Sequence, residues 1–244
     1  MPTAHEEPPK SRIAVLLAQY PPDELERRKQ AVLHAAPAGV EIGFRQLEGS
    51  VYRKGLTNLH RALVAPLIGR AAVEAEQDGF DAIVPYGTLD LGVEETRHLV
   101  DIPMMGPGRT GAHAAAMLAE RFVVVCYDQP HVVMFRRLLP AWRVDSYVTS
   151  IRPVGAYITD MAKDPDGLRE LFVTTAKAAV EEEDAELILP LGMTMVPVLL
   201  SASQLTQEIG LPVLDPLALT LRMAEGLAST GFVNSRAAYP PAEL

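Results

Sequence analysis

Apolar runs of strand length alternate along this chain with longer segments in which apolar residues recur every three or four positions. A continuous run such as 13–17 is typical of a strand that is buried on both faces of a parallel sheet. The segment 63–77 has Ala and Leu at helical spacing, and Pro66 falls in the first turn of that predicted helix. The alternation predicts an α/β fold with parallel sheets covered by helices. Further strands are predicted at 40–44, 121–126, 146–150 and 187–190, and further helices at 23–28, 110–119, 132–139, 166–183 and 215–227.

Two segments of the chain, 81–88 and 185–194, have nearly the same pattern, an apolar strand that ends in a short loop with Thr. Each is followed by a helix-like stretch and a second short apolar strand, at 102–106 in the first half and at 211–215 in the second. A repeat on this scale is typical of a duplicated unit. The pattern therefore predicts two lobes of flavodoxin-like character, related by pseudo-twofold symmetry, with the active-site cleft between them.

The duplicated pattern resembles the aspartate/glutamate/hydantoin racemase superfamily, which includes maleate isomerase and arylmalonate decarboxylase. In that superfamily a Cys stands in the loop after a central strand of each half, and the two thiols flank the α-carbon of the substrate. The matching triplets here are Tyr86-Gly87-Thr88 and Gly192-Met193-Thr194, so both cysteines are absent. The surrounding pattern is retained at Asp90, Gly92, Arg97, Ile102-Pro103, 122–125 and 211–215.

The resemblance also implies a domain organisation, because the C-terminal portion of the superfamily fold packs back on the first lobe. The first lobe is expected to comprise 12–112 and 215–233, and the second 113–214. The segments 1–11 and 234–244 are expected to be flexible arms. Homologous scaffolds commonly assemble, so a homo-oligomer is expected.

The charge balance and the length of the apolar runs exclude several partners. The chain of 244 residues has 22 Lys and Arg against 31 Asp and Glu, a net charge of −9, which disfavours nucleic acid because phosphate binding requires a basic face. The apolar runs fall well short of the roughly 20 residues that cross a bilayer, and 1–11 lacks the apolar core of a secretory signal. We therefore expect a cytoplasmic protein with no membrane partner. A single Cys excludes an internal disulfide and a multi-Cys metal cluster.

The loops that follow the strands are the candidates for substrate contacts, because ligands of parallel α/β sheets bind beyond the carboxyl ends of the strands. The Thr88 and Thr194 loops offer backbone N–H groups and a hydroxyl to a carboxylate, although either Thr could equally be a helix N-cap. Arg109 could supply a positive charge for an acidic substrate or pair with a neighbour. The predicted substrate-binding residues are Gln19, Tyr20, Gly87, Thr88, Arg109, Tyr127, Met193, Thr194 and Met195.

Because both thiols are missing, other side chains must transfer the protons. Neither Gly87 nor Met193 can transfer a proton, so the two-thiol mechanism is not expected. Tyr86 could donate to an oxyanion, or transfer a proton if its pKa were lowered, with packing of the pocket wall as the alternative. Asp90 is a candidate base, with bracing of the loop as the more favoured role.

The end of the strand 121–126 carries a second group of candidates. Cys126 could reach the cleft or be a buried small hydrophobe. Asp128 and His131 could form an orienting network, with Asp128 as an N-cap as the alternative. Glu95 and His98 lie three apart on a predicted helix and offer too few ligands for a metal. The predicted catalytic residues are Tyr86, Asp90, Asp128, His131 and Cys126, and no metal site is predicted.

These features together predict an enzyme that needs no cofactor and acts on a small anionic or carbonyl substrate, such as a carboxylate, amide or imide. The superfamily scaffold suggests isomerisation, decarboxylation or hydrolysis by non-thiol acid/base chemistry. The alternative is a catalytically silent protein that binds a small acid on the same scaffold.

Overall fold

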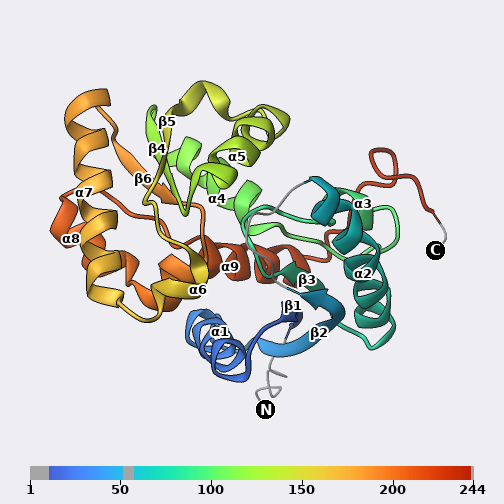
Figure 1. The fold of residues 1–244 in the computed structure, drawn as a ribbon. Helices are drawn as coiled ribbons and strands as arrows, with labels where there is room; N and C mark the ends of the chain where they lie inside the picture. Colours follow the sequence, from blue (N-terminus) through green and yellow to red (C-terminus); the bar gives the residue numbers. More distant parts are fainter. Residues whose placement is uncertain (1–10, 52–57, 243–244) are drawn as a thin grey trace, which may run out of the picture.

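The computed structural model describes residues 11–51 and 58–242 and shows two α/β lobes side by side (Figure 1). The sheet of the first lobe has the order β2-β1-β3, with β1 (Arg12–Gln19), β2 (Glu41–Val51) and β3 (Ala82–Pro85) all parallel. An isolated parallel bridge joins Ile83 to Met104. This bridge is what remains of the strand predicted at 102–106, because Pro103 has no backbone N–H to donate to a longer ladder.

The second lobe repeats this arrangement with a parallel sheet of order β5-β4-β6. Its strands are β4 (Phe122–Cys126), β5 (Val148–Pro153) and β6 (Leu187–Pro190), and an isolated bridge joins Ile188 to Val213. The two sheets place equivalent strands in equivalent positions, so the predicted fold class of two pseudo-symmetric parallel lobes is confirmed.

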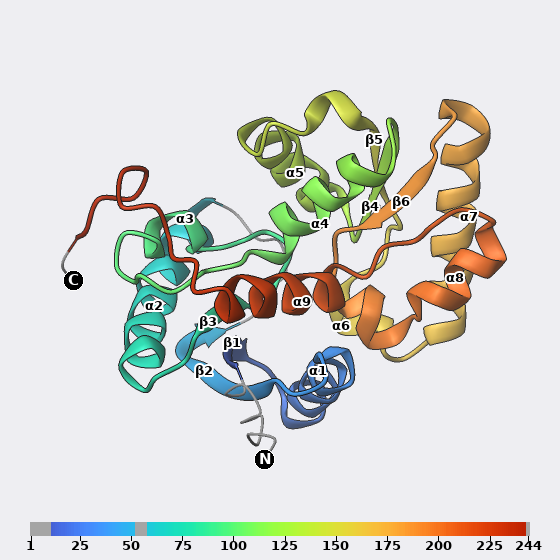
Figure 2. The same cartoon turned by 180° about the vertical axis from the view of Figure 1, so that it is seen from behind.

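Helices cover the faces of both sheets, as Figure 2 shows from behind. The first lobe carries α1 (Pro22–Ala35), α2 (Asn58–Gln77) and α3 (Val93–Thr96), and the next helix, α4 (Pro107–Leu118), packs Ala112 and Ala115 into the core of the second lobe. The second lobe carries α5 (Gln129–Ala141), the 3-10 turn η1 (Asp145–Tyr147), α6 (Ile158–Met161), α7 (Pro165–Glu183), the π-type turn η2 (Thr194–Leu199) and α8 (Ala202–Ile209). The last helix, α9 (Pro216–Ser229), returns to the first lobe and packs on β1, β3 and α1, while α4 packs on both α9 and β6.

Most predicted elements have somewhat different ends in the structure; the strand predicted at 40–44, for example, runs from Glu41 to Val51. Two further differences concern a proline and a turn. The helix predicted from 63 begins already at Asn58, so Pro66 lies inside α2 rather than in its first turn. The strand predicted at 146–150 is displaced to 148–153, because the residues before it form the 3-10 turn η1. In both cases the element is present and only its ends were wrong.

The core consists of layers on the two faces of each sheet. Along β1, Ala14 and Leu16 face one layer while Ile13, Val15 and Leu17 face another, as the two-residue period of a strand requires. All five of these side chains are at most 1% exposed. A parallel strand buried on both faces thus explains the uninterrupted apolar run in the sequence.

The C-terminal segment lies along the first lobe near α3. The backbone N–H of Asn234 donates to the carbonyl of Asp101 at 2.8 Å, and its side-chain amide donates to the carbonyl of Ile102 at 2.7 Å. Further along, Ala242 donates to the carbonyl of His98 at 2.9 Å. The segment 234–244, expected to be a flexible arm, therefore makes specific hydrogen bonds up to residue 242. The other predicted arm, at 1–11, lies almost wholly outside the described residues.

Within 11–51 and 58–242, no helix is long and apolar enough to cross a membrane. Nor does the same part of the chain contain a group of three or more His, Cys, Asp or Glu side chains that could hold a metal ion.

Candidate functional site

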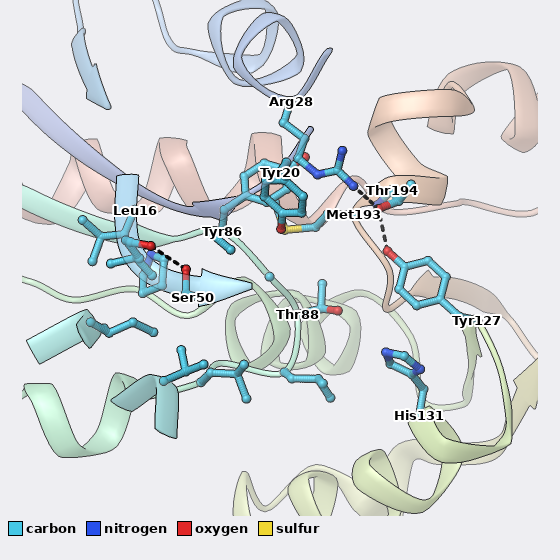
Figure 3. Close-up of a pocket in the computed structure, with 18 residues that line it drawn as sticks. Leu16, Tyr20, Arg28, Ser50, Tyr86, Thr88, Tyr127, His131, Met193 and Thr194 are labelled. Atoms are coloured by element: carbon cyan, nitrogen blue, oxygen red, sulfur yellow. Dashed lines mark hydrogen bonds between the residues drawn. The ribbon is translucent and has the colours of Figure 1, made fainter. Parts of the chain in front are cut away.

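A cavity of about 130 Å³ lies between the two lobes, at the carboxyl ends of the central strands (Figure 3). An engineered cavity of about 150 Å³ holds benzene, so the space suits one small ring or a short-chain acid. Both lobes contribute to its wall. The lining residues are Leu16, Ala18, Tyr20, Arg28, Leu47, Ser50, Val64, Ile68, Pro85, Tyr86, Gly87, Thr88, Leu89, Leu91, Tyr127, His131, Met193 and Thr194.

Arg28 brings a buried positive charge to this wall from α1. The residue is 1% exposed, and its guanidinium lies over the ring of Tyr20, 4.1 Å from the ring centre. Its Nη2 donates to Oγ1 of Thr194 at 2.8 Å, and its Nη1 donates to the carboxylate of Glu24 one turn earlier in the helix. The Arg28–Thr194 hydrogen bond therefore joins the first lobe to the second at the cavity.

Tyr127 and Thr194 form the second-lobe side of the same contact. The backbone N–H of Thr194 donates to the phenol oxygen of Tyr127 at 2.8 Å. A Cβ at Gly192 would lie 2.6 Å from the Tyr127 ring, so only glycine admits this close approach. The N–H and hydroxyl of Thr194 thus both bond to protein groups, rather than forming the open carboxylate cradle or the N-cap considered from the sequence.

A buried His131 and a partly buried Asp128 form a pair at the start of α5. Asp128 is the N-cap of that helix, since its Oδ1 accepts from the backbone N–H of His131 at 3.1 Å. The same Oδ1 lies 2.6 Å from Nδ1 of His131. Both alternatives that the sequence left open, the cap and the network, are therefore present. A carboxylate on Nδ1 orients the imidazole and leaves Nε2 as the nitrogen with a free lone pair, and His131 lines the cavity.

Tyr86 contributes a phenol from the loop after β3. Burial raises the pKa of Tyr86 well above 10.0, and the positive charge of Arg28 offsets this only in part. The hydroxyl has no hydrogen-bond partner among the described residues. A phenol in this state keeps its proton and is a hydrogen-bond donor at neutral pH, and the lowered pKa on which proton transfer from Tyr86 depended is not found.

Gly87 and Met193 stand at the two loop positions that the sequence predicted to face each other. Both line the cavity, and Met193 is 2% exposed and packs within the first-lobe core layer that contains Val15 and Leu17. Thr88 is buried and lines the cavity beside them. The structure therefore brings together Tyr20, Tyr86, Gly87, Thr88, Tyr127, His131, Met193 and Thr194 from the predicted set.

Besides Asp128, Asp90 and Arg109, three predicted site residues do not line this cavity. Cys126 is fully buried in the core layer beneath α4 and α5, and burial together with the charge of Asp128 raises the pKa of its thiol to about 12. Met195 is fully buried in the opposite layer. Gln19 is exposed at the end of β1. Strand alternation explains the first of these, because Cys126 and Tyr127 point to opposite faces of β4 and only Tyr127 faces the cavity.

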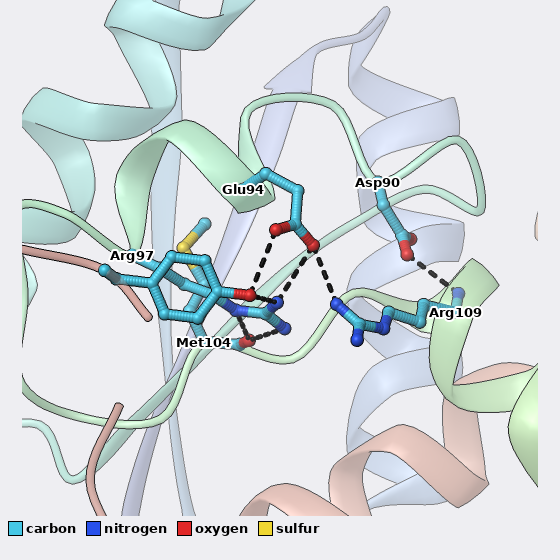
Figure 4. Close-up of polar contacts among 6 residues, drawn as sticks. Asp90, Glu94, Arg97, Met104 and Arg109 are labelled. Atoms are coloured by element: carbon cyan, nitrogen blue, oxygen red, sulfur yellow. Dashed lines mark hydrogen bonds and ion pairs between the residues drawn. The ribbon is translucent and has the colours of Figure 1, made fainter. Parts of the chain in front are cut away.

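Asp90 and Arg109 are also displaced from the cavity, and they meet each other at the start of α4 (Figure 4). The carboxylate of Asp90 accepts from the backbone N–H groups of Gly108 at 2.8 Å and Arg109 at 2.7 Å. The Arg109 side chain pairs with Glu94 at 2.8 Å. Burial raises the pKa of Asp90 to about 7 although the two N–H groups oppose this. Asp90 therefore braces the loop, and Arg109 pairs with a neighbour, the second of the two roles considered for it.

Comparisons with known proteins decide the family. The model of the Asp/Glu/Hydantoin racemase family matches residues 30–224. The chain belongs to the Asp/Glu/hydantoin racemase family. It is 31% identical over 163 residues to a hydantoin racemase of Pseudomonas sp. (strain NS671), covering 67% of this chain and 64% of the relative, so this match spans less than two thirds of that relative. It is 27% identical over 191 residues to a hydantoin racemase of Paenarthrobacter aurescens, covering 78% and 77%.

Solved structures agree on the fold. The allantoin racemase of Pseudomonas fluorescens superposes with a TM-score of 0.86 at 23% identity, over 96% of this chain and 97% of that one. A liganded mutant of arylmalonate decarboxylase superposes with a TM-score of 0.63 at 15% identity, over 94% and 97%. Both likenesses concern the arrangement of the two lobes.

Arg28 is the site residue that sequence reasoning missed in this member of the racemase family. It lies four residues before Val32, and both are buried on α1. A charged residue in the apolar stripe of a helix is the signal that could have revealed it, because burying an unpaired charge is costly. The pattern of a strand-end loop could not reveal it, since Arg28 comes from the middle of a helix.

Proposed function

We propose that this member of the Asp/Glu/hydantoin racemase family is an enzyme that moves a proton at the carbon next to a carbonyl group, in a small carboxylate or a cyclic amide or imide. His131 is the base that takes and returns the proton, the Tyr86 hydroxyl donates a hydrogen bond to the carbonyl oxygen, and no cofactor is needed. The observation that supports this most directly is that His131, paired with Asp128, lines the same cavity as Tyr86. Figure 3 shows His131 and Tyr86 on different sides of that cavity.

The roles follow from the chemistry of each group. The carboxylate of Asp128 on Nδ1 stabilises the imidazolium that forms when Nε2 takes a proton. Burial raises the pKa of the Tyr86 phenol well above 10.0, so the phenol stays protonated at pH 7. Tyr86 therefore keeps its proton and acts as a hydrogen-bond donor to the oxygen on which negative charge develops, not as a base.

This asymmetry bears on the reaction type. Racemisation by two bases requires an acid and a base that exchange roles in the two directions. A site with one base and one persistent donor suits an isomerisation or a decarboxylation that ends in protonation of an enolate. We therefore propose isomerase or lyase chemistry on the racemase scaffold.

Deuterium incorporation tests the proposal. The purified protein is incubated in D₂O with 5-substituted hydantoins, methylmalonate, maleate and short amino acids, and exchange at the α-carbon is followed by proton NMR. We expect exchange with at least one compound, and a decrease of about 100-fold or more in His131→Gln and in Tyr86→Phe, the size of a typical acid–base contribution. His34→Gln is the control, because His34 is exposed on α1 and outside the cavity lining.

Two outcomes would reject this assignment. Exchange that survives both cavity substitutions would mean that other groups carry the protons. Line-broadening of a compound without any exchange would favour the alternative, a protein that binds a small acid and leaves it unchanged.

A further inference from the structure

The guanidinium of Arg28 is a buried positive charge in the cavity wall. Its nearest charged partner, the carboxylate of Glu24, does not fully neutralise it. A buried charge costs several kcal/mol unless it is paired and its hydrogen bonds are satisfied. Arg28 shares the carboxylate of Glu24 with Arg27. Burial raises the pKa of Glu24, but the hydrogen bonds from Arg28 and Arg27 outweigh it and lower that pKa. Two guanidinium groups thus meet one carboxylate, and one positive charge is left over.

The remaining contacts of Arg28 are neutral. Thr194 accepts one hydrogen bond at 2.8 Å, and the Tyr20 ring contributes a cation–π contact at 4.1 Å. The Nε of Arg28 is buried and has no acceptor among the described residues. A buried donor without an acceptor destabilises the folded chain, so an acceptor supplied by a ligand is expected here.

A second unsatisfied donor lies on the same wall. The Tyr86 hydroxyl is buried and has no partner in the described part of the chain, and both Tyr86 and Arg28 line the cavity. Figure 3 shows them grouped with Tyr20 and Met193. The wall therefore combines an excess positive charge with two donors that lack acceptors.

We propose that the cavity selects a ligand with an anionic oxygen, and that Arg28 is the residue that recognises the charge. The oxygen belongs to a carboxylate or to an ionised imide. Arg28 acts here as a specificity-determining residue, in place of Arg109, which pairs with Glu94 away from the cavity. This inference rests on the proposed function for the location of the site, but binding of the anion requires no proton transfer.

The same residue also connects ligand charge to the contact between the lobes. Nη2 of Arg28 donates a hydrogen bond to Oγ1 of Thr194 in the second lobe. The backbone N–H of Thr194 in turn donates to the phenol oxygen of Tyr127. An anion that neutralises the remaining positive charge of Arg28 stabilises the guanidinium where it bonds to Thr194.

Isothermal titration calorimetry with matched ligands tests the proposal on the unmodified protein. Succinate is compared with succinamide, and hydantoin with 3-methylhydantoin, whose imide nitrogen cannot ionise, at neutral and at alkaline pH. We expect the charged member of one pair to bind at least about tenfold more tightly, as for a hydrogen bond to a charged group. The pair that shows the preference identifies the source of the anionic oxygen. Equal affinity within both pairs, or no binding of either anion at millimolar concentration, would overturn the proposal.

Variants assign the preference to Arg28. We expect Arg28→Gln to reduce the charged-over-neutral ratio to within about twofold, and Arg28→Lys to retain part of it because the charge is kept while the fork geometry is lost. Arg109→Gln is the matched control and keeps the ratio. If Arg28→Gln does not fold, the unmodified protein, Arg28→Lys and Arg109→Gln still decide the outcome. A smaller charged-over-neutral affinity ratio in Arg109→Gln than in Arg28→Lys would assign recognition of the anion to Arg109.

Failure of this inference can be told apart from failure of the proposed function. Deuterium exchange without a charge preference would remove Arg28 from ligand recognition and leave the enzyme assignment intact. A charge preference that disappears in Arg28→Gln, without exchange of any compound, would support the inference and identify a binding protein.

Discussion

Gly87 adopts a backbone conformation that few other residues tolerate, at the position where the family resemblance places the first catalytic thiol. Its φ is +150°, and a Cβ there would meet no atom within 4 Å. Space is therefore available, but the conformation itself is strained for any residue with a Cβ. A cysteine at this position would be strained in the present loop conformation, so the loss of the thiol is matched by the shape of the backbone.

This conformation makes a prediction about stability at Gly87. We expect Gly87→Ala to reduce the free energy of unfolding by about 1–2 kcal/mol through backbone strain alone, measured by urea denaturation. Gly226→Ala is the control: Gly226 lies inside α9 without a positive φ and also has open space. There alanine is expected to stabilise by about 0.5–1 kcal/mol. A neutral result at Gly87 would mean that the loop relaxes without strain.

At the scale of elements, Asp90 fastens the loop after β3 to the start of α4. Its carboxylate accepts from two N–H groups of the first turn, and that loop also carries Gly87 and Thr88 of the cavity wall. A buried carboxyl that bridges two elements links the protonation state of one side chain to the position of the site.

The raised pKa of Asp90 predicts how stability depends on pH. Burial raises this pKa from 3.8 to about 7 in the folded state, so the folded chain holds the proton more tightly than the unfolded chain. The contribution to stability is complete below pH 3.8 and is lost as the pH rises to about 7. The loss amounts to at most about 4 kcal/mol, at 1.36 kcal/mol per unit.

Denaturation at a series of pH values checks this. We expect the free energy of unfolding to fall between about pH 4 and pH 7, and Asp90→Asn to flatten that decline because the titrating group is gone. If the two proteins have the same slope, Asp90 does not titrate in this range.

At the scale of the molecule, α9 and α4 connect the two sheets. α9 is the last helix in the sequence, yet it packs on the first-lobe strands β1 and β3, and α4 lies against both α9 and the second-lobe strand β6. Met193, from a second-lobe loop, packs in the core of the first lobe. Buried contacts made by α9, α4 and Met193 therefore join the two lobes.

These shared contacts predict one cooperative unfolding transition. Trp142 is the single Trp of the chain and is buried in the second lobe, so its fluorescence reports on that lobe. We expect its thermal transition to coincide with the loss of helical circular dichroism. Leu221→Ala, a cavity-forming change in the first-lobe face of α9, should cost about 2–5 kcal/mol and lower both midpoints together by several degrees. A Trp142 signal that does not move in this variant would mean that the lobes unfold separately.

The sequence by itself determined the strands, the duplication and the two loops, because each is a local pattern of apolar and turn residues. β6 at 187–190 was predicted with its observed ends, and the Tyr86 and Met193 loops do meet at one cavity. These features follow from periodicity and from the rule that ligands bind beyond the carboxyl ends of parallel strands.

Only the tertiary structure decided which side chains of those loops face the cavity and what reaches it from elsewhere. Neighbouring residues of a strand point to opposite faces, so Cys126 lies in the core while Tyr127 lines the site. Arg28 bonds to Thr194 across 166 positions of sequence. Such a contact depends on how two lobes pack, which no local pattern encodes.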